Sequence, residues 1–324
     1  MPRFLGGMFG NQTRSSTAKN DDVEGVYNID QQYYMKTQDG WAPNFSATGG
    51  TTSSWSESPT VTWTTHTFTY PNTDNFVVTG APPTATIHFC VIGGGGAGAA
   101  DGSSGGGSGG GGGGGYRVSK QDPTKPLNAP VTVPSIPISS QTYVITVGAG
   151  AAGGTNINQD NGGDSKIATP TSDLVVGSGG GGGGWFTGTP GNTGGSGGGG
   201  SMPNASGGAT VASPDPLSPT VQGYPGHQAG GGGGGAGTAG GPSSPGGQGH
   251  SGGGGFNTWL SYGPGSTPQS ASASWGGAGD RTGASNGSQI ATYGGGGGGT
   301  SGNGTSGGAG GNGVVIILYD STDW

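Results

Sequence analysis

The residues best able to do chemistry are few and widely separated in this sequence. The four histidines, His66, His88, His227 and His250, show none of the short spacings that bring two imidazoles to one metal ion. His66 and His88 lie in stretches that alternate like β-strands, so we expect both to be structural residues. The single cysteine, Cys90, sits in the apolar run TIHFCVIG and is expected to be a small buried side chain.

Acidic side chains are no better placed for catalysis. A glycoside hydrolase needs two paired carboxylates, and nothing marks a pair among Asp160, Asp164, Asp215 and Asp280. The stretch NQDNGGDS, residues 158–165, offers oxygen ligands of the kind that calcium prefers, but its composition is also that of a turn, which we favour. No lysine follows a glycine run as a P-loop requires. The sequence predicts no catalytic residue, no metal site, no cofactor and hence no enzyme.

The side chains that remain as recognition candidates are mostly aromatic. They fall in the inserts that separate glycine runs, where too few aliphatic residues are present to bury them all. Aromatic rings stack on sugars and anchor protein interfaces at low entropic cost; the alternative is that they cap the ends of a glycine-rich structure. The candidates for receptor binding are Trp185, Phe186, Tyr224, His227, Phe256, Trp259, Tyr262 and Trp275.

The composition limits the possible partners. Glycine supplies 85 of the 324 residues, and only 8% of residues are charged, with a formal net charge of −7. Disordered chains stay solvated through high net charge, which the glycine-rich half lacks. No basic patch could follow the phosphates of a nucleic acid. The sequence has no apolar run near the ~20 residues of a membrane span and no signal-peptide core at its start. We therefore expect no nucleic-acid partner and no membrane insertion.

Short β-strands must position these residues. From Thr60 the stretch TVTWTTHTFTYP alternates, with Val61 and Trp63 on one face and Phe68 and Tyr70 on the other. Helical periodicity is absent, so the fold class is all-β. The apolar last strand should return to pair with the strands of residues 60–150. The further predicted strands are NFVVTG, TATIHFCVIGG, GYRVSK, QTYVITVG, SKIATP, DLVVGS and GVVIILYD.

Pure glycine runs, the longest at Gly109–Gly115, separate these strands. A flexible linker is one interpretation, but the runs recur at similar length inside one strand framework. A polyproline-type helix has three residues per turn and no internal hydrogen bonds, so its backbone groups can bond to neighbouring chains on all sides. Contact on all three faces requires glycine at every position. We therefore predict a β-sandwich of short strands with a long polyglycine II-type helix bundle inserted between them.

The first 58 residues differ from the rest. They lack strand periodicity, and after a Ser/Thr-rich spacer the alternation begins only at about residue 60. A dense aromatic patch lies in this part and would need a partner to bury it. We expect residues 1–58 to be an irregular virion-attachment segment and residues 59–324 to be the glycine-rich domain. The attachment candidates are Tyr27, Tyr33, Tyr34 and Trp41.

Three stretches resemble a known family: VIGGGG at Val91–Gly96, VGAGAAGG at Val147–Gly154 and GNGVVIILY at Gly311–Tyr319. They are similar to motifs of the glycine-rich domain found in bacteriophage tail-fibre and other virion proteins, and the resemblance spans about residues 60–319. It implies polyglycine bundles at a fibre tip with receptor-binding loops between the glycine helices. Some receptor tyrosine kinases carry a similar sandwich but lack an N-terminal segment like Gly25–Trp41, which looks like a short module of phage structural proteins.

These observations lead to an expected function. We expect a bacteriophage structural protein located in the virion, of the tail-fibre or adhesin type. Its N-terminal region would bind other virion proteins, and its glycine-rich domain would project toward a host cell-surface glycan or protein. Two alternatives remain open: a capsid head fibre or decoration protein, and a non-viral glycine-rich structural matrix protein.

Overall fold

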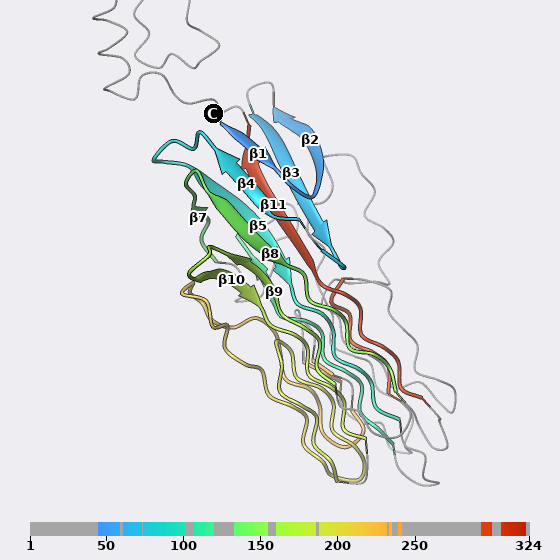
Figure 1. Ribbon diagram of the computed structural model, residues 1–324. Coiled ribbons are helices and arrows are strands. Elements are labelled where there is room, and N and C mark those ends of the chain that lie inside the picture. The colour runs from blue at the N-terminus through green and yellow to red at the C-terminus, as the bar shows by residue number, and fades with distance from the viewer. Residues whose placement is uncertain are drawn as a thin grey trace, which may run out of the picture.

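The computed structural model describes residues 45–58, 61–72, 74–100, 107–119, 133–154, 160–185, 188–231, 233–234, 239–241, 293–299 and 306–321. Within these ranges the chain is all-β, with two antiparallel sheets and no helix (Figure 1). It follows that none of this part forms a helix able to cross a membrane. The strands are β1 (Ser46–Thr48), β2 (Thr51–Ser58), β3 (Val61–Thr69), β4 (Phe76–Thr79), β5 (Thr86–Ile92), β6 (Tyr116–Val118), β7 (Ile136–Pro137), β8 (Thr142–Thr146), β9 (Ser165–Ala168), β10 (Asp173–Gly177) and β11 (Val314–Asp320).

The strands form a sandwich in which the last strand is central. One sheet has the order β1-β4-β8-β9-β10, and the other has the order β2-β3-β11-β5-β6, with β7 paired to β5. Strand β11 lies antiparallel to both of its neighbours, so that Val315 pairs with Phe68 on β3 and with Val91 on β5. The expected return of the last strand to the strands of residues 60–150 is therefore confirmed.

Side chains of β11 point alternately to the two faces of its sheet, and each face belongs to a different apolar cluster. Val315, Ile317 and Tyr319 point into the main core between the sheets, while Ile316 and Leu318 belong to a second cluster on the opposite face of the six-stranded sheet. The run VVIILY is buried on both faces because of this central position. The main core also contains Phe68, Phe76, Val78, Ile87, Phe89, Val91, Tyr143, Ile145, Ile167 and Val175.

Two edge strands and the short β7 were not predicted. Residues 46–58 were expected to be a spacer, but β1 pairs with β4 and β2 pairs with β3. Strand β2 was missed because it is an exposed edge strand rich in Ser and Thr. Its sequence therefore lacks the apolar alternation that marks a buried strand. Its register on β3 is supported by hydroxyl pairs such as Ser53 Oγ to Thr65 Oγ1 at 2.6 Å. The strand framework thus starts at Ser46, before the boundary expected at residue 58.

The chain passes between the two sheets at Gly49 and Gly50, which connect β1 to β2. Both have positive φ, 113° and 62°, a region that favours glycine. A Cβ at Gly49 would lie 2.0 Å from the carbonyl oxygen of Asn75, so no side chain fits there. The carbonyl of Gly49 accepts a hydrogen bond of 2.7 Å from the Nδ1 of His66 on β3. This bond anchors the Gly49–Gly50 connection between the sheets to strand β3.

His66 is a buried structural residue, as the sequence indicated. Its ring stacks on Tyr319 with centroids 5.7 Å apart and meets Phe76 edge-on at 5.1 Å. Because a carbonyl can only accept, Nδ1 carries the proton toward Gly49, and Nε2 accepts from the Tyr319 hydroxyl at 3.3 Å. Burial lowers the pKa of His66 from its ordinary value of 6.5, and the bond to Gly49 opposes this to a smaller extent.

We predict that His66 makes stability depend on pH. A lowered pKa in the folded state means that the unfolded chain binds the proton more tightly, so the free energy of unfolding falls as the pH drops below about 6.5 and levels off below the pKa of the folded state. Urea unfolding at a series of pH values between 7.5 and 5 measures this slope. His66→Gln should flatten the slope, and an unchanged slope in this variant would assign the pH dependence to other groups.

Candidate functional site

Below the sandwich lies a body built from glycine-rich segments, which we call the glycine array. Strands β5, β8 and β10 run directly into such segments, and β6, β9 and β11 emerge directly from them. The segments continue side by side as extended, wavy ribbons that leave the sheets in one direction (Figure 1). The array comprises residues 93–100, 107–115, 147–154, 160–164, 178–185, 191–200, 205–211, 222–231, 293–299 and 306–313.

Backbone hydrogen bonds within the array repeat every three residues. Along residues 93–99 each N–H donates to another segment, at distances of 2.8 to 3.1 Å. Gly93, Gly96 and Ala99 donate to residues 109–115, Gly94 and Ala97 to residues 160–163, and Gly95 and Gly98 to residues 308–311. One segment is thus bonded on three sides by three neighbours, whereas a β-strand has neighbours on only two sides.

Residues 179–184 repeat this pattern with one side completed by side chains. Two of the three rows of N–H groups donate to backbone carbonyls of residues 94–97 and 196–199. In the third row, Gly179 donates to Asp164 Oδ1 and Gly182 to Asn161 Oδ1, each at 2.9 Å. Two acceptors of the stretch NQDNGGDS therefore bind backbone amides. Among the described residues no cluster of three or more His, Cys, Asp or Glu could hold a metal ion.

The close approach of these segments explains the purity of the glycine runs. A Cβ at Gly96 would lie 2.2 Å from the carbonyl oxygen of Gly181, and one at Gly198 would lie 2.0 Å from that of Gly182. Both distances are well inside van der Waals contact, and the atoms met are backbone, which cannot rotate away. Gly154, at the margin, has no atom within 4 Å of the corresponding position.

A buried ion pair, which sequence reasoning missed, ties the segment of residues 211–222 to the sandwich. Arg117 on β6 and Asp215 are both fully buried and meet at 2.7 Å between Nη2 and Oδ1. Arg117 also donates to the carbonyls of Pro219 and Leu217. Asp215 Oδ2 accepts from the backbone N–H of Val176 on β10 at 2.8 Å. An available signal was the isolation of Asp215, since no other charged residue lies between Asp173 and Asp280.

The segment of residues 211–222 closes the side of the sandwich between β6 and β10. Beyond Asp215, the fully buried Gln222 continues the contact: its carbonyl accepts from Tyr116 N–H at 2.9 Å and its Oε1 accepts from Ser178 N–H at 2.9 Å. Its Nε2 donates to Ser178 Oγ. Side chains of this segment thus satisfy amides at the β10 edge, and its backbone carbonyl at Gln222 satisfies the Tyr116 amide at the β6 edge, at the point where the array begins.

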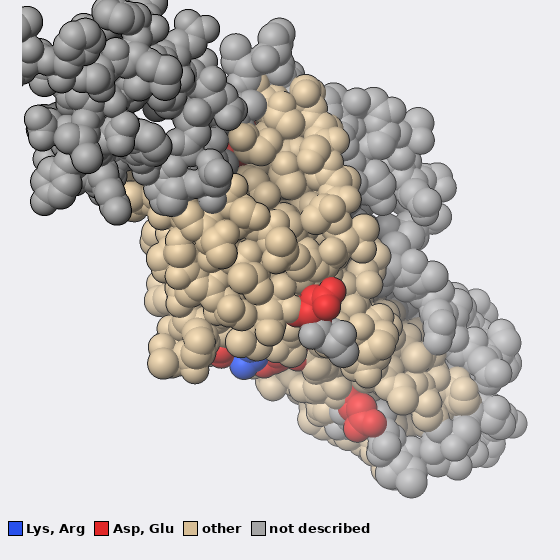
Figure 2. Space-filling view, turned by 45° about the horizontal axis from the view of Figure 1, so that its top comes forward, with Lys and Arg blue, Asp and Glu red and all other residues tan. Residues whose placement is uncertain are grey.

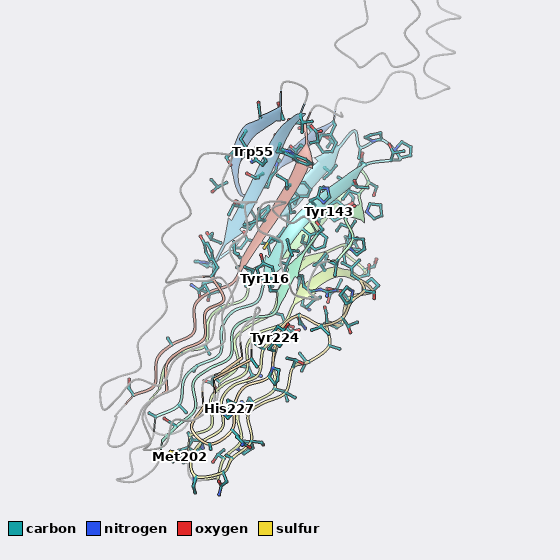
Figure 3. All side chains as sticks on the ribbon, turned by 180° about the vertical axis from the view of Figure 1, so that it is seen from behind. Trp55, Tyr116, Tyr143, Met202, Tyr224 and His227 are labelled. Atoms are coloured by element: carbon teal, nitrogen blue, oxygen red, sulfur yellow. The ribbon has the colours of Figure 1, made fainter. Side chains whose placement is uncertain are left out.

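Two short turns at the far end of the array are bonded to each other through their described residues. Thr189 N–H donates to Ser201 Oγ at 2.8 Å, and Ser201 N–H donates back to the Thr189 carbonyl at 3.0 Å. Met202 N–H donates to the Gly107 carbonyl at 2.7 Å. Figure 3 shows Met202 at the end of the molecule opposite the sheets. The half-buried Trp185 directly follows the glycine run of residues 179–184 into the first of these turns.

The described receptor candidates lie on two different segments of the array, Trp185 on one and Tyr224 and His227 on the other. Tyr224 and His227 are half-buried and lie along the flank of the array, with Tyr224 nearer the sheets, while Met202 marks the end (Figure 3). The carbonyls of Tyr224 and His227 accept from Gly197 and Gly200, three residues apart on one segment. The remaining candidates lie outside the described residues: Phe186, Phe256, Trp259, Tyr262, Trp275 and the attachment candidates Tyr27, Tyr33, Tyr34 and Trp41.

The one thiol is buried in the second apolar cluster. Cys90 on β5 is fully buried, as the sequence predicted. Burial raises the pKa of the Cys90 thiol to about 12, and a hydrogen bond with Tyr116 opposes this to a smaller extent. The thiolate that a nucleophile or metal ligand requires is therefore disfavoured at neutral pH.

We predict that a single methyl group inside the array is destabilising. Gly96→Ala forces its Cβ against a backbone carbonyl, and overpacking of this kind costs about 1–3 kcal/mol of unfolding free energy. Gly154→Ala is the matched control, because its Cβ meets open space, and we expect a change within about 0.5 kcal/mol. Urea denaturation measures both. Equal effects of the two substitutions would contradict close packing of the array.

A second prediction concerns the buried ion pair. Asp215→Ala leaves the Arg117 charge buried without its carboxylate partner and should cost about 3–5 kcal/mol of unfolding free energy. The double substitution Arg117→Met with Asp215→Leu removes both charges and should recover much of this loss. Unfolding free energies from a double-mutant cycle give the coupling, and a loss below 1 kcal/mol for Asp215→Ala would argue against the role of the pair in holding residues 211–222.

Comparison with known proteins places this architecture in a family. A search of curated protein sequences found no significant match. The model of a family described as the glycine-rich domain matches residues 71–320, which include eight of the strands, β4 to β11, and the glycine array. Since the match covers well over half of the chain, the protein belongs to this glycine-rich domain family.

Proposed function

We propose that the glycine array is a bundle of polyglycine II-type helices, and that the protein is a bacteriophage virion protein of the tail-fibre or adhesin type. In this proposal the array is a rigid body that projects from the particle and carries a contact surface for the host cell at its far end. The N-terminal region joins the protein to other virion components.

The hydrogen-bond repeat of three residues carries the structural half of the proposal. A helix with three residues per turn directs every third N–H the same way, which matches the alternation of three acceptor segments along residues 93–99. At about 3.1 Å per residue, residues 93–100 would extend about 25 Å from the sheet. Bonding on three sides makes such a rod stiff although it lacks apolar side chains, and stiffness suits a projecting body.

The location of residues 45 and 321 supports the proposed orientation of the protein on the virion. Phe45, where the described chain begins, packs edge-on against Tyr319 near the end of β11 with ring centroids 5.0 Å apart. β11 runs away from the array, so residues 45 and 321 lie at the end of the sandwich opposite the turns that carry Trp185 and Met202 (Figures 1 and 3). Attachment through the N-terminal region would therefore leave the far end of the array facing outward.

The first test is the location of the protein. Antibodies raised against the whole chain, applied to purified phage particles, should label tail structures in electron micrographs, and particles carrying a deletion of residues 1–44 should lack the label. Labelling of the capsid shell would favour a head fibre or decoration protein instead. Absence of the protein from particles would overturn the virion proposal.

We predict that Trp185 contributes to adsorption. Trp185→Ala removes the aromatic side chain that leads into the far turns, and we expect at least tenfold slower adsorption of particles to host cells while the protein still unfolds in one cooperative transition. Tyr70→Ala is the matched control, since Tyr70 is 46% exposed but follows β3 near the sheets. Unchanged adsorption with Trp185→Ala would indicate that this ring only caps the array.

A further inference from the structure

The chemistry of the far end selects one class of partner. We infer that it binds an uncharged glycan, and that this binding is independent of ionic strength; the inference rests on the proposed role of the protein in host contact. Three observations carry it: the fixed frame of the two turns, the side chains they present, and the distribution of charge along the chain.

The two turns form a fixed frame. Thr189 and Ser201 exchange three hydrogen bonds of 2.8 to 3.0 Å, two of them through the buried Ser201 hydroxyl. Gly188 N–H donates to the Met202 carbonyl at 3.3 Å, and Met202 N–H in turn bonds to Gly107. The turn that carries Trp185 and the turn that carries Met202 are thus held together. A side chain presented from a fixed frame loses little entropy when a ligand binds.

The side chains on this frame are apolar or neutral. Trp185 and Met202 are half-buried, and Pro190, Pro203 and Asn204 are exposed. An indole face stacks on the C–H groups of a sugar ring, and an amide can donate to and accept from sugar hydroxyls. These five side chains are few beside the roughly 20–30 residues per side of a typical protein interface. This size fits one or two sugar units.

The distribution of charge in the described part of the chain does not favour an anionic ligand at the array. Between residues 178 and 312 the sequence has only three charged residues, Asp215, Asp280 and Arg281, and the Asp215 carboxylate is buried against Arg117. In the described part, the cations are the buried Arg117 and Lys166, which pairs with Asp173 at 3.0 Å. Figure 2 shows a described surface that is almost wholly uncharged. Sulfated, phosphorylated or sialylated glycans would find no cluster of cations here.

Weak binding by such a small contact is compatible with host attachment. Several copies on one particle raise the avidity by about 10²–10⁴-fold without any new contact. Because neither partner carries charge at the contact, screening by salt leaves the interaction unchanged.

The test uses the full-length protein on an array of neutral hexose and N-acetylhexosamine oligosaccharides together with sulfated and sialylated counterparts. We expect binding to neutral members only, less than a twofold change between 50 and 500 mM NaCl, and at least a tenfold loss with Trp185→Ala. Tyr70→Ala should bind as the unmodified protein does. Binding confined to anionic members, or a tenfold loss at high salt, would overturn the inference.

Treatment of host cells separates this inference from the proposed function. Periodate, which cleaves the vicinal diols of sugars, should abolish binding of the protein to cells, whereas protease treatment of the cells should leave it intact. Loss after protease alone would point to a protein receptor and overturn the glycan inference while leaving the adhesin proposal standing. Failure to bind untreated cells of any host, with a folded protein, would count against the adhesin proposal itself.

Discussion

Backbone hydrogen bonding between glycine segments is the interaction on which the rest of this structure depends. A chain with this composition cannot stabilise itself by burying apolar side chains along its length, and every buried amide that lacks an acceptor is costly. The array meets this constraint by surrounding a segment with neighbours on three sides, so that successive amides of residues 93–99 find acceptors on different segments. Such spacing is possible only without Cβ atoms, because carbonyl oxygens occupy the positions that these atoms would take.

The sandwich supplies what the array lacks. Ordering a glycine costs more conformational entropy than ordering any other residue, so the segments need fixed starting points. The main core holds strands β5, β8 and β10 in place. Each of these strands continues into a glycine segment, whose starting position and direction are therefore fixed. Where the edges of the sheets would expose amides at this junction, Asp215 and Gln222 provide the acceptors. A few polar side chains thus provide hydrogen-bond acceptors where the two-layer sandwich meets the array, whose segments are bonded on three sides.

The distribution of side chains in the array limits the groups that could contact a partner. The array carries almost no charge and few side chains, and those it does carry are concentrated in turns and on the flanks. The far end is held by hydrogen bonds between Thr189 and Ser201 and by the backbone bonds of Met202 to Gly107 and Gly188. Among the described residues, the side chains at this end are an aromatic ring and neutral groups, which is why the proposed recognition relies on ring stacking and neutral hydrogen bonds.

The sequence by itself determined the all-β class, the eight strands with clear apolar alternation and the structural roles of His66 and Cys90, since alternation and burial are local properties of the side chains. It did not reveal β1 and β2, because a Ser/Thr-rich edge strand shows no apolar period and is defined only by its partner. Only the tertiary structure decided which glycine segments are neighbours, that Arg117 meets Asp215 across 98 residues of sequence, and that Tyr224 and His227 lie along the flank of the array. A glycine run has no side chains to specify its neighbours, so their choice is left to the strands that deliver each segment.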